Sequence, residues 1–356
     1  MDNVANRYLT PEQAAERLQL GVETVYKWLR SGKLRGRRIS HKAWRIAEVD
    51  LMSLIQGQNI SELFFEQYLS EQGLGNADHH PEFPGATKIV DYRLLHNGKQ
   101  LWFEVKEFDD DRKLFAGQKP GQVRVGAYDP YKGIRNKIND AWRKFRDYDR
   151  ECCSLVLFNE GANNVHITSG NCVLGAMLGD ITYSIPMDFE KGIETGPATK
   201  IFAGRGKMIH PHTKEPQNTT ISAVITLERF PVGQHEARIR FANQEANEPV
   251  QLSWKERILM RQPQPSDAEV ALRTVVYENP HAANPLPVDI FTGPFDERWG
   301  LVENRIDLTV IGPRMEDLKK RERELDLPFG PYKRYLERRK RAGFDTRPTG
   351  LRGTFA

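Results

Sequence analysis

Two carboxylates and one lysine on neighbouring predicted strands could carry metal-assisted chemistry. Strand-like runs at 87–95 and 100–108 carry Asp91 on the first and Glu104 and Lys106 on the second. The connection between the runs contains Asn-Gly, the strongest short signal for a β-hairpin. Because residues two apart on a strand share a face, Glu104 and Lys106 project together, and the tight hairpin lets that face meet Asp91.

This set of side chains suits phosphodiester hydrolysis. That reaction needs one or two Mg²⁺ ions held by oxygen ligands, which activate a water molecule and neutralise charge on the phosphate. Asp91 and Glu104 could supply such ligands, and Lys106 could position the attacking water and stabilise the transition state. An Asp and a Glu-x-Lys on paired strands also arise by chance, so the surrounding elements decide how much the pattern means.

The elements around the hairpin follow a definite order. A helix is expected at 61–72, before the hairpin, where Ser61 would cap it and Gly73 would end it. A helix at 130–150 and a short buried strand at 154–158 are expected after it. The sequence therefore predicts helix, strand pair, helix and strand.

In this context the spacing of Asp91 and Glu104-Val105-Lys106 resembles the PD-(D/E)xK nuclease superfamily, over about residues 60 to 160. The resemblance implies a restriction-endonuclease-like α-β-β-β-α-β core in which Asp91 and Glu104 bind the metal. It further implies the Val105 backbone carbonyl as a ligand, Lys106 as the catalytic lysine, and Mg²⁺ as the cofactor, with Mn²⁺ able to replace it. One departure is Val90, which precedes Asp91 where the motif has proline.

Many of these nucleases also carry a glutamate on the first helix that reaches the metal. Glu62 and Glu66 are the candidates here. In a helical projection Glu62 borders the apolar stripe, with Phe65 and Leu69 as its i+3 and i+7 neighbours, whereas Glu66 points away from the centre of the stripe. We therefore expect Glu62 to be the additional catalytic acid.

The helix that follows the hairpin is basic. Between residues 134 and 145 it carries Arg135, Lys137, Arg143 and Lys144. These side chains could follow the backbone of a substrate, or they could form the solvated face of an amphipathic helix.

The N-terminal segment predicts a separate small domain. Thr10 and Gln13 form a capping-box signal for a first helix. A second helix is expected at 22–30, a basic hairpin at 33–45 and a closing helix at 47–55.

This pattern resembles the excisionase and MerR-like winged helix-turn-helix family. The likeness rests on Tyr8-Leu9-Thr10, Ala14-Ala15, Leu18, Gly21-Val22, Thr24-Val25-Tyr26-Lys27-Trp28, Gly32-Lys33-Leu34 and Arg37. In such a domain the second helix enters the major groove, and the wing touches phosphate or the minor groove. The resemblance implies DNA contacts from Thr24, Lys27 and Arg30 of the second helix and from Lys33, Arg35, Arg37 and Arg38 of the wing. The alternative is a helical adaptor that binds protein and carries a solvated basic hairpin.

Composition bounds the remaining possibilities. With 356 residues, 39% hydrophobic and 28% charged, the chain has room for two or three folded domains and is not a disordered protein. Its three cysteines have neither disulfide-framework nor zinc-ligand spacing, and we expect free thiols. No apolar run approaches the roughly 20 residues that span a bilayer, and the first residues do not resemble a signal peptide, so we expect a cytoplasmic protein without a membrane partner.

The charge is modest overall but uneven. The net charge is +4, yet the segment from Lys27 to Arg45 has eight basic residues and no acid, and the segment from Lys333 to Arg341 has six basic residues and one acid. Two such segments indicate a polyanionic partner.

We therefore predict a multi-domain α/β protein. The expected parts are a winged helix-turn-helix at 1–56, a nuclease core at 60–165, a sheet extension or accessory domain at 166–312 with strands at 221–230 and 271–278, and a basic helical segment with a tail at 313–356. The predicted function is a Mg²⁺-dependent DNA endonuclease in defence or repair, with double-stranded DNA as the partner. A homodimer and a protein that activates or restrains cleavage would both be compatible with it.

Two alternatives remain open. The chain could be a DNA-binding regulator or recombination accessory factor with an inactive nuclease-like domain. It could also cleave RNA or DNA junctions, with the helix-turn-helix recognising shape or a protein.

Overall fold

The structure is a computed structural model. It describes residues 8–18, 20–31, 34–39, 43–56, 59–75, 77–108, 129–159, 168–184, 186–188, 190, 193–196, 199–247, 269–303 and 305–325. The chain divides into two compact units, one formed by residues 1–229 and 272–311 and the other by residues 230–271 and 312–356. Within the described ranges, every helix is too short or too polar to cross a lipid bilayer.

The N-terminal region is a small helical domain with a three-stranded sheet. Its elements are β1 (Tyr8–Leu9), α1 (Pro11–Leu18), α2 (Val22–Ser31), β2 (Arg37–Arg38), β3 (Trp44–Ala47) and α3 (Glu48–Gln56), with the strands in the order β1-β3-β2. The predicted capping box is confirmed, because the backbone nitrogen of Thr10 donates to Gln13 Oε1 at 2.9 Å and that of Gln13 donates to Thr10 Oγ1 at 3.3 Å. Val25, Ile46 and Leu51 are fully buried and join the helices to the sheet. The predicted helices and hairpin are present, and β1 is an addition that the sequence did not indicate.

The next part of the chain contains the predicted hairpin and its flanking helices. The elements are α4 (Ile60–Glu71), β4 (Asp78–His79), β5 (Tyr92–His96), β6 (Lys99–Glu107), α6 (Lys132–Phe145) and β7 (Cys152–Phe158). Asn97 and Gly98 form the two-residue hairpin turn, both with positive φ, as a type I′ turn requires. The predicted order of helix, strand pair, helix and strand is therefore confirmed, with the short strand β4 added before the pair.

Two local predictions were wrong. The first strand does not run from 87 but begins at Tyr92, because the Thr87 backbone N–H and hydroxyl both bind the Asp147 carboxylate, at 2.8 and 2.6 Å, and hold that segment away from the sheet. The helix α4 is capped by Asn59 rather than Ser61, because the backbone and amide nitrogens of Asn59 both donate to the Glu62 carboxylate, at 3.0 and 3.1 Å.

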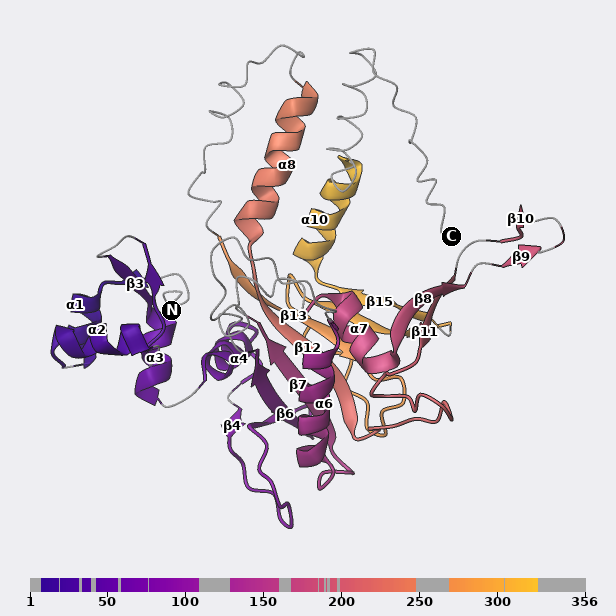
Figure 1. The fold of residues 1–356 in the computed structure, drawn as a ribbon, viewed down its shortest axis with the longest axis horizontal. Helices are drawn as coiled ribbons and strands as arrows, with labels where there is room; N and C mark the ends of the chain where they lie inside the picture. Colours follow the sequence, from indigo (N-terminus) through magenta and orange to yellow (C-terminus); the bar gives the residue numbers. More distant parts are fainter. Residues whose placement is uncertain are drawn as a thin grey trace, which may run out of the picture. The chain divides into compact units, whose positions relative to one another are not determined.

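These strands belong to one mixed eight-stranded sheet (Figure 1). Its order is β15-β14-β13-β12-β7-β6-β5-β4, with β12 (Ile221–Phe230), β13 (Ala271–Glu278), β14 (Glu297–Val302) and β15 (Arg305–Ile311). Strands β6, β7 and β12 run parallel to one another, and β13 runs parallel to β14, whereas the β4–β5, β5–β6 and β14–β15 pairs are antiparallel. The strands predicted at 221–230 and 271–278 are confirmed, and strands from the 166–312 segment continue the sheet that carries the hairpin.

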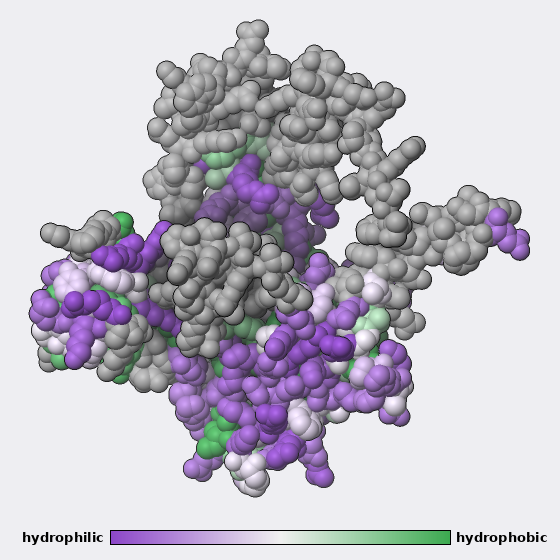
Figure 2. All heavy atoms as spheres, in the orientation of Figure 1, coloured by the Kyte–Doolittle hydropathy of each residue, from purple (hydrophilic) through white to green (hydrophobic). Residues whose placement is uncertain are grey.

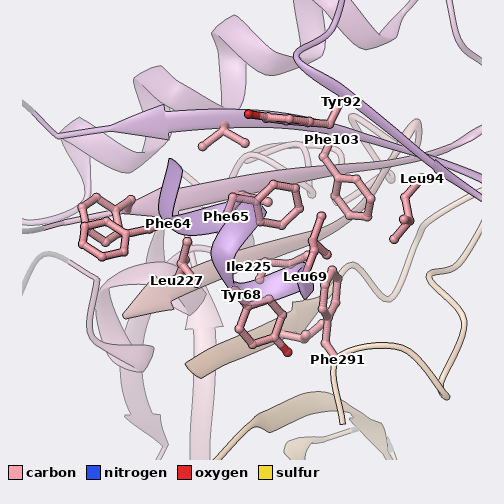
Figure 3. Packing of buried hydrophobic residues seen from close by; sticks show 14 of the residues in the cluster. Phe64, Phe65, Tyr68, Leu69, Tyr92, Leu94, Phe103, Ile225, Leu227 and Phe291 are labelled. Atoms are coloured by element: carbon pink, nitrogen blue, oxygen red, sulfur yellow. The ribbon is translucent and has the colours of Figure 1, made fainter. Parts of the chain in front are cut away.

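Apolar side chains cover both faces of this sheet. On one face α4 contributes Phe64, Phe65, Tyr68 and Leu69, which pack on Phe103 and other strand residues (Figure 3). On the other face lie α6 and α7 (Gly170–Leu178). Strand β7 is buried along its whole length, as expected of a central parallel strand.

A buried polar network fixes the chain before β14. The Asp296 carboxylate, 1% exposed, accepts hydrogen bonds from the Tyr68 hydroxyl at 2.5 Å, the Thr274 backbone nitrogen at 2.7 Å and the Gly293 backbone nitrogen at 2.6 Å. Burial raises the pKa of Asp296, although these hydrogen bonds act in the opposite direction. The network ties α4 to β13 and to the turn that leads into β14.

Four short strands follow α7. Strands β8 (Asp180–Ser184) and β11 (Thr199–Ala203) form one antiparallel pair, and β9 (Met187–Asp188) and β10 (Ile193–Glu194) form another. They lie outside the eight-stranded sheet.

The second unit contains α8 (Val232–Asn247) and α10 (Pro313–Glu324). Arg321 forms an ion pair with Glu236 at 2.9 Å, and His235 Nδ1 lies 2.9 Å from Glu322. Val232 and Ile239 of α8 and Met315 and Leu318 of α10 are buried. Helix α10 lies within the predicted helical segment at 313–356. The basic run at 333–341 and the predicted tail fall outside the described residues.

Candidate active site and nucleic-acid interface

The hairpin register places Asp91 opposite Glu104. The last paired residues of β5 and β6 are Tyr92 and Phe103, so Asp91 stands one step beyond that pair. Asp91 lies at a bend just before β5 rather than on the strand, which corrects the sequence expectation. The backbone N–H of Val105 donates to Asp91 Oδ2 at 2.8 Å, so the hydrogen bond that a longer β5 would have made goes to this carboxylate.

The three predicted catalytic side chains on this hairpin come together. Glu104 is fully buried and Asp91 is 6% exposed. The Lys106 ammonium forms an ion pair with Glu104 and lies 3.9 Å from Asp91 Oδ2. The side chains of Glu104 and Lys106 point to the sheet face that α6 covers. Their partners on the parallel strand β7, Leu155 and Leu157, belong to the core on that side.

Lys144 is a fourth member of the cluster. From the last turn of α6 its ammonium reaches Asp91 Oδ1 at 3.3 Å and Glu104 Oε2 at 2.7 Å. From the sequence, Lys144 was expected only as one of the basic residues of this helix, and its place in the site was not predicted. The available signal was its position three residues after Ala141 and one before Phe145, both of which are fully buried on the face that packs against the sheet.

The electrostatics of the cluster follow from its burial. Desolvation and the nearby charge of Asp91 raise the pKa of Glu104, while Lys106 and Lys144 act to lower it. Desolvation acts to lower the pKa of Lys144, but its bonds to Glu104 and Asp91 outweigh this effect, so the pKa is raised. The two lysines thus offset part of the effect of burial on Glu104, and the two acids favour the charged form of Lys144.

The donor set suits a hard divalent cation. Glu104 Oε1 is buried and lies in ion-pair range of both ammonium groups, yet it accepts no hydrogen bond of normal geometry. Two carboxylates with such an oxygen are the ligands that Mg²⁺ prefers. The Val105 carbonyl stays a predicted third ligand. Within the described residues, no group of three or more His, Cys, Asp or Glu side chains is arranged to hold a metal ion.

The two glutamates of α4 have other roles in this structure. Glu62 caps its helix through Asn59, and its Oε2 lies 3.8 Å from His79 Nε2. Glu66 accepts a hydrogen bond from the Tyr92 hydroxyl at 2.8 Å. Neither completes a three-ligand group with Asp91 and Glu104, and the role predicted for Glu62 stays a prediction.

The helix-turn-helix region presents a polar and basic surface. On α2 the side chains of Lys27 and Arg30 are exposed and that of Thr24 is partly exposed, and on β2 Arg37 and Arg38 are exposed. In Figure 2 hydrophilic residues dominate the visible described surface, with small hydrophobic spots between them.

Two predicted DNA contacts differ from the others. Lys33 lies outside the described residues. Arg35 is engaged within the protein, because its Nη1 lies 2.5 Å from Glu107 Oε1.

Comparison with known proteins identifies one region of the chain. Residues 8–59 match a family model described as a helix-turn-helix domain. The protein therefore carries an N-terminal DNA-binding helix-turn-helix domain of the excisionase-like type, as the sequence predicted. Neither a curated protein nor a solved structure matches the chain.

Proposed function

We propose that this protein is a Mg²⁺-dependent DNA endonuclease that its helix-turn-helix domain directs to DNA. The observation that carries the proposal is the convergence of Asp91, just before β5, with Glu104 and Lys106 of the second half of β6. Burial of an acid is costly unless the acid is paired or functional, and this pair is buried beside two lysines.

The topology around the site supports the same assignment. Strands β4, β5, β6 and β7 are adjacent, β6 and β7 are parallel, and α4 and α6 lie on opposite faces of the sheet. This element order is compatible with the α-β-β-β-α-β core that the resemblance to the PD-(D/E)xK superfamily implies, and it supports the proposal.

Each residue has a distinct part in the proposed reaction. Asp91, Glu104 and the Val105 carbonyl would hold the cation, which would lower the pKa of a bound water and polarise the scissile phosphate. Lys106 would orient the attacking water and stabilise negative charge that develops on the phosphate oxygens. The exposed basic residues of α2 and β2 would bind the DNA backbone and add affinity that depends on salt but little on sequence.

One observation favours a second candidate. Lys106 and Lys144 already neutralise Asp91 and Glu104. A site in which these ion pairs are permanent would be structural, and the protein would then be a non-catalytic DNA-binding regulator or recombination accessory factor.

Cleavage assays separate the two candidates. Supercoiled plasmid, linear duplex, single-stranded DNA, branched DNA and RNA would be incubated with Mg²⁺ or Mn²⁺ and resolved on gels. Asp91→Asn and Lys106→Met would be compared with wild type at equal occupancy of the nucleic acid, with Asp140→Asn, an exposed acid on α6, as the matched control.

The outcomes are distinct. Cleavage that persists in the Asp140 variant and disappears in the other two would establish the enzyme and its site. Binding to DNA without cleavage of any substrate, with either cation, would leave the regulator as the function.

A further inference from the structure

Lys144 bridges the two acids of the candidate site. Its single ammonium group lies 3.3 Å from Asp91 Oδ1 and 2.7 Å from Glu104, whereas the Lys106 ammonium contacts Glu104 and stays 3.9 Å from Asp91. Of the two lysines, Lys144 is thus the one within hydrogen-bond distance of both carboxylates. A cation that used both carboxylates as ligands would need the space between them, because metal–oxygen distances of about 2.0–2.1 Å for Mg²⁺ leave no room for an ammonium in the same position.

The charge of the cluster leads to the same conclusion. Asp91 and Glu104 contribute two negative charges, and Lys106 and Lys144 contribute two positive charges. A divalent cation added to this balanced, largely buried set would leave two uncompensated positive charges in a region of low dielectric constant, which is strongly unfavourable. The electrostatic penalty therefore falls when one ammonium moves out, because one excess positive charge remains instead of two.

Lys144 is better placed to leave than Lys106. It extends from the last turn of α6, where the C-terminal end of the helix dipole attracts a positive charge. Its side chain is 24% exposed, close to the 27% of Lys106, so both lysines reach water and exposure does not distinguish them. Lys106, in contrast, is two residues from Glu104 on the same strand, so its ammonium stays beside that acid.

We infer that Lys144 is an internal counter-ion that holds Asp91 and Glu104 together until a divalent cation takes its place. The inference rests on the proposed function, because it concerns the cation of that site. In this role Lys144 is a positioning residue: it competes with the divalent cation for the two carboxylates and thereby sets the affinity of the site for that cation.

The first test measures divalent-cation binding without DNA. Isothermal titration calorimetry would compare the affinities of wild type, Lys144→Gln and Lys132→Gln for Mg²⁺ and Mn²⁺. Lys132→Gln is the control, because it removes an exposed positive charge from the first turn of the same helix. Removal of a competing charge should tighten binding by about 5- to 50-fold in the Lys144 variant, within the usual range of coupling between two binding events. The control should stay within about twofold of wild type, since screened surface charges interact weakly at this range. Equal or weaker binding by Lys144→Gln would overturn the inference.

A second measurement uses the wild-type protein and so does not depend on the folding of a variant. Lysine acylation followed by mass spectrometry would report the accessibility of Lys144 in EDTA and at saturating Mg²⁺. We expect reactivity at Lys144 to rise several-fold with Mg²⁺, whereas reactivity at Lys132 should not change. Lower or unchanged reactivity at Lys144 would show that it does not leave.

The two proposals fail in different ways. Wild-type protein that binds Mg²⁺ and cleaves DNA, with no effect of Lys144→Gln on affinity, would refute the counter-ion role and leave the nuclease intact. Absence of divalent binding in wild type and in both variants at millimolar concentrations would refute the metal site, and the counter-ion role with it.

Discussion

The backbone N–H of Val105 donates a hydrogen bond of 2.8 Å to the carboxylate of Asp91, so the residue between Glu104 and Lys106 fixes the acid that precedes the neighbouring strand β5. The geometry of the site is therefore partly a property of the hairpin backbone. Substitutions of Asp91 should separate this structural role from a catalytic one.

Asp91→Asn should abolish cleavage but preserve the fold, because an amide oxygen can still accept the Val105 hydrogen bond. Asp91→Ala should also abolish cleavage and lower the free energy of unfolding by about 1–3 kcal/mol, since it leaves a buried N–H without a partner. Urea unfolding monitored by circular dichroism, together with plasmid cleavage, measures both effects. Equal free energies of unfolding for the two variants would show that the hydrogen bond between Val105 and Asp91 does not contribute to stability.

Lys106→Met should reduce the cleavage rate by about 10²–10⁴-fold while DNA binding persists, because a positioned cationic group at the reacting phosphate contributes on this scale. Single-turnover cleavage with saturating protein checks the rate, and fluorescence anisotropy checks the binding. Lys99→Met, at the exposed opposite end of β6, is the matched control and should cleave at the wild-type rate. A loss of less than about threefold for Lys106→Met would remove this lysine from the proposed mechanism.

Replacement of Arg37 and Arg38 together by alanine should weaken DNA binding similarly on all sequences. If both residues contact phosphates, the slope of log affinity against log salt concentration should fall by about 2, because each lost contact lowers it by about 1. Anisotropy titrations over a range of salt concentrations measure the slope. Arg305→Ala on β15 removes another exposed charge and should leave the slope as it is. An unaltered slope in the double variant would place the DNA contacts elsewhere.

Asp296 should make stability depend on pH. Burial raises its pKa in the folded state, so the folded protein retains the proton more strongly than the unfolded chain does. The resulting stabilisation is complete below about pH 4, the pKa of an unfolded aspartate, and is lost as pH rises through the raised folded-state pKa. Relative to Asp296→Asn, which cannot ionise, wild type should therefore lose stability as pH increases above about 4. Urea unfolding at several pH values measures the difference.

Asp289 provides a control of opposite sign. A hydrogen bond with His96 lowers the pKa of Asp289. Its contribution is present above the unfolded pKa and is lost as pH falls, so wild type should lose stability relative to Asp289→Asn in the acidic direction. If the stability of wild type relative to each variant changed with pH in the same direction for Asp289 and Asp296, the pKa shifts assigned to these two residues would be contradicted.

Local signals in the sequence were sufficient for much of the fold. Asn97-Gly98 set the hairpin, and periodic apolar residues located α4, α6, β7, β12 and β13. Strand β14 was missed because buried polar residues interrupt its apolar alternation, whereas in β15 polar and apolar residues do alternate, and this strand signal was overlooked. Glu297 pairs with Arg273, and Arg298, 1% exposed, pairs with Glu278 and with backbone carbonyls. A pattern of apolar residues cannot indicate a position that is buried through an ion pair.

The site was accessible to sequence analysis only where its residues are close along the chain. Asp91, Glu104 and Lys106 lie on one hairpin, so the spacing alone brought them together. Lys144 is separated from Glu104 by 40 positions and reaches it through the packing of α6 on the sheet. A lysine at the border of an apolar stripe does not reveal which acids it will meet.

The helical unit of α8 and α10 is built from two stretches of chain, residues 230–271 and 312–356, with a sheet segment between them. Dissection of the protein into fragments is constrained by this arrangement. A truncation that ends before residue 312 would remove α10 and leave α8 without the partner of its ion pairs at Glu236 and His235. A shortened protein of that kind would be prone to aggregation through its exposed helix, so loss of activity in it would say nothing about catalysis. Single substitutions in the full chain are therefore the sound way to assign function to this protein.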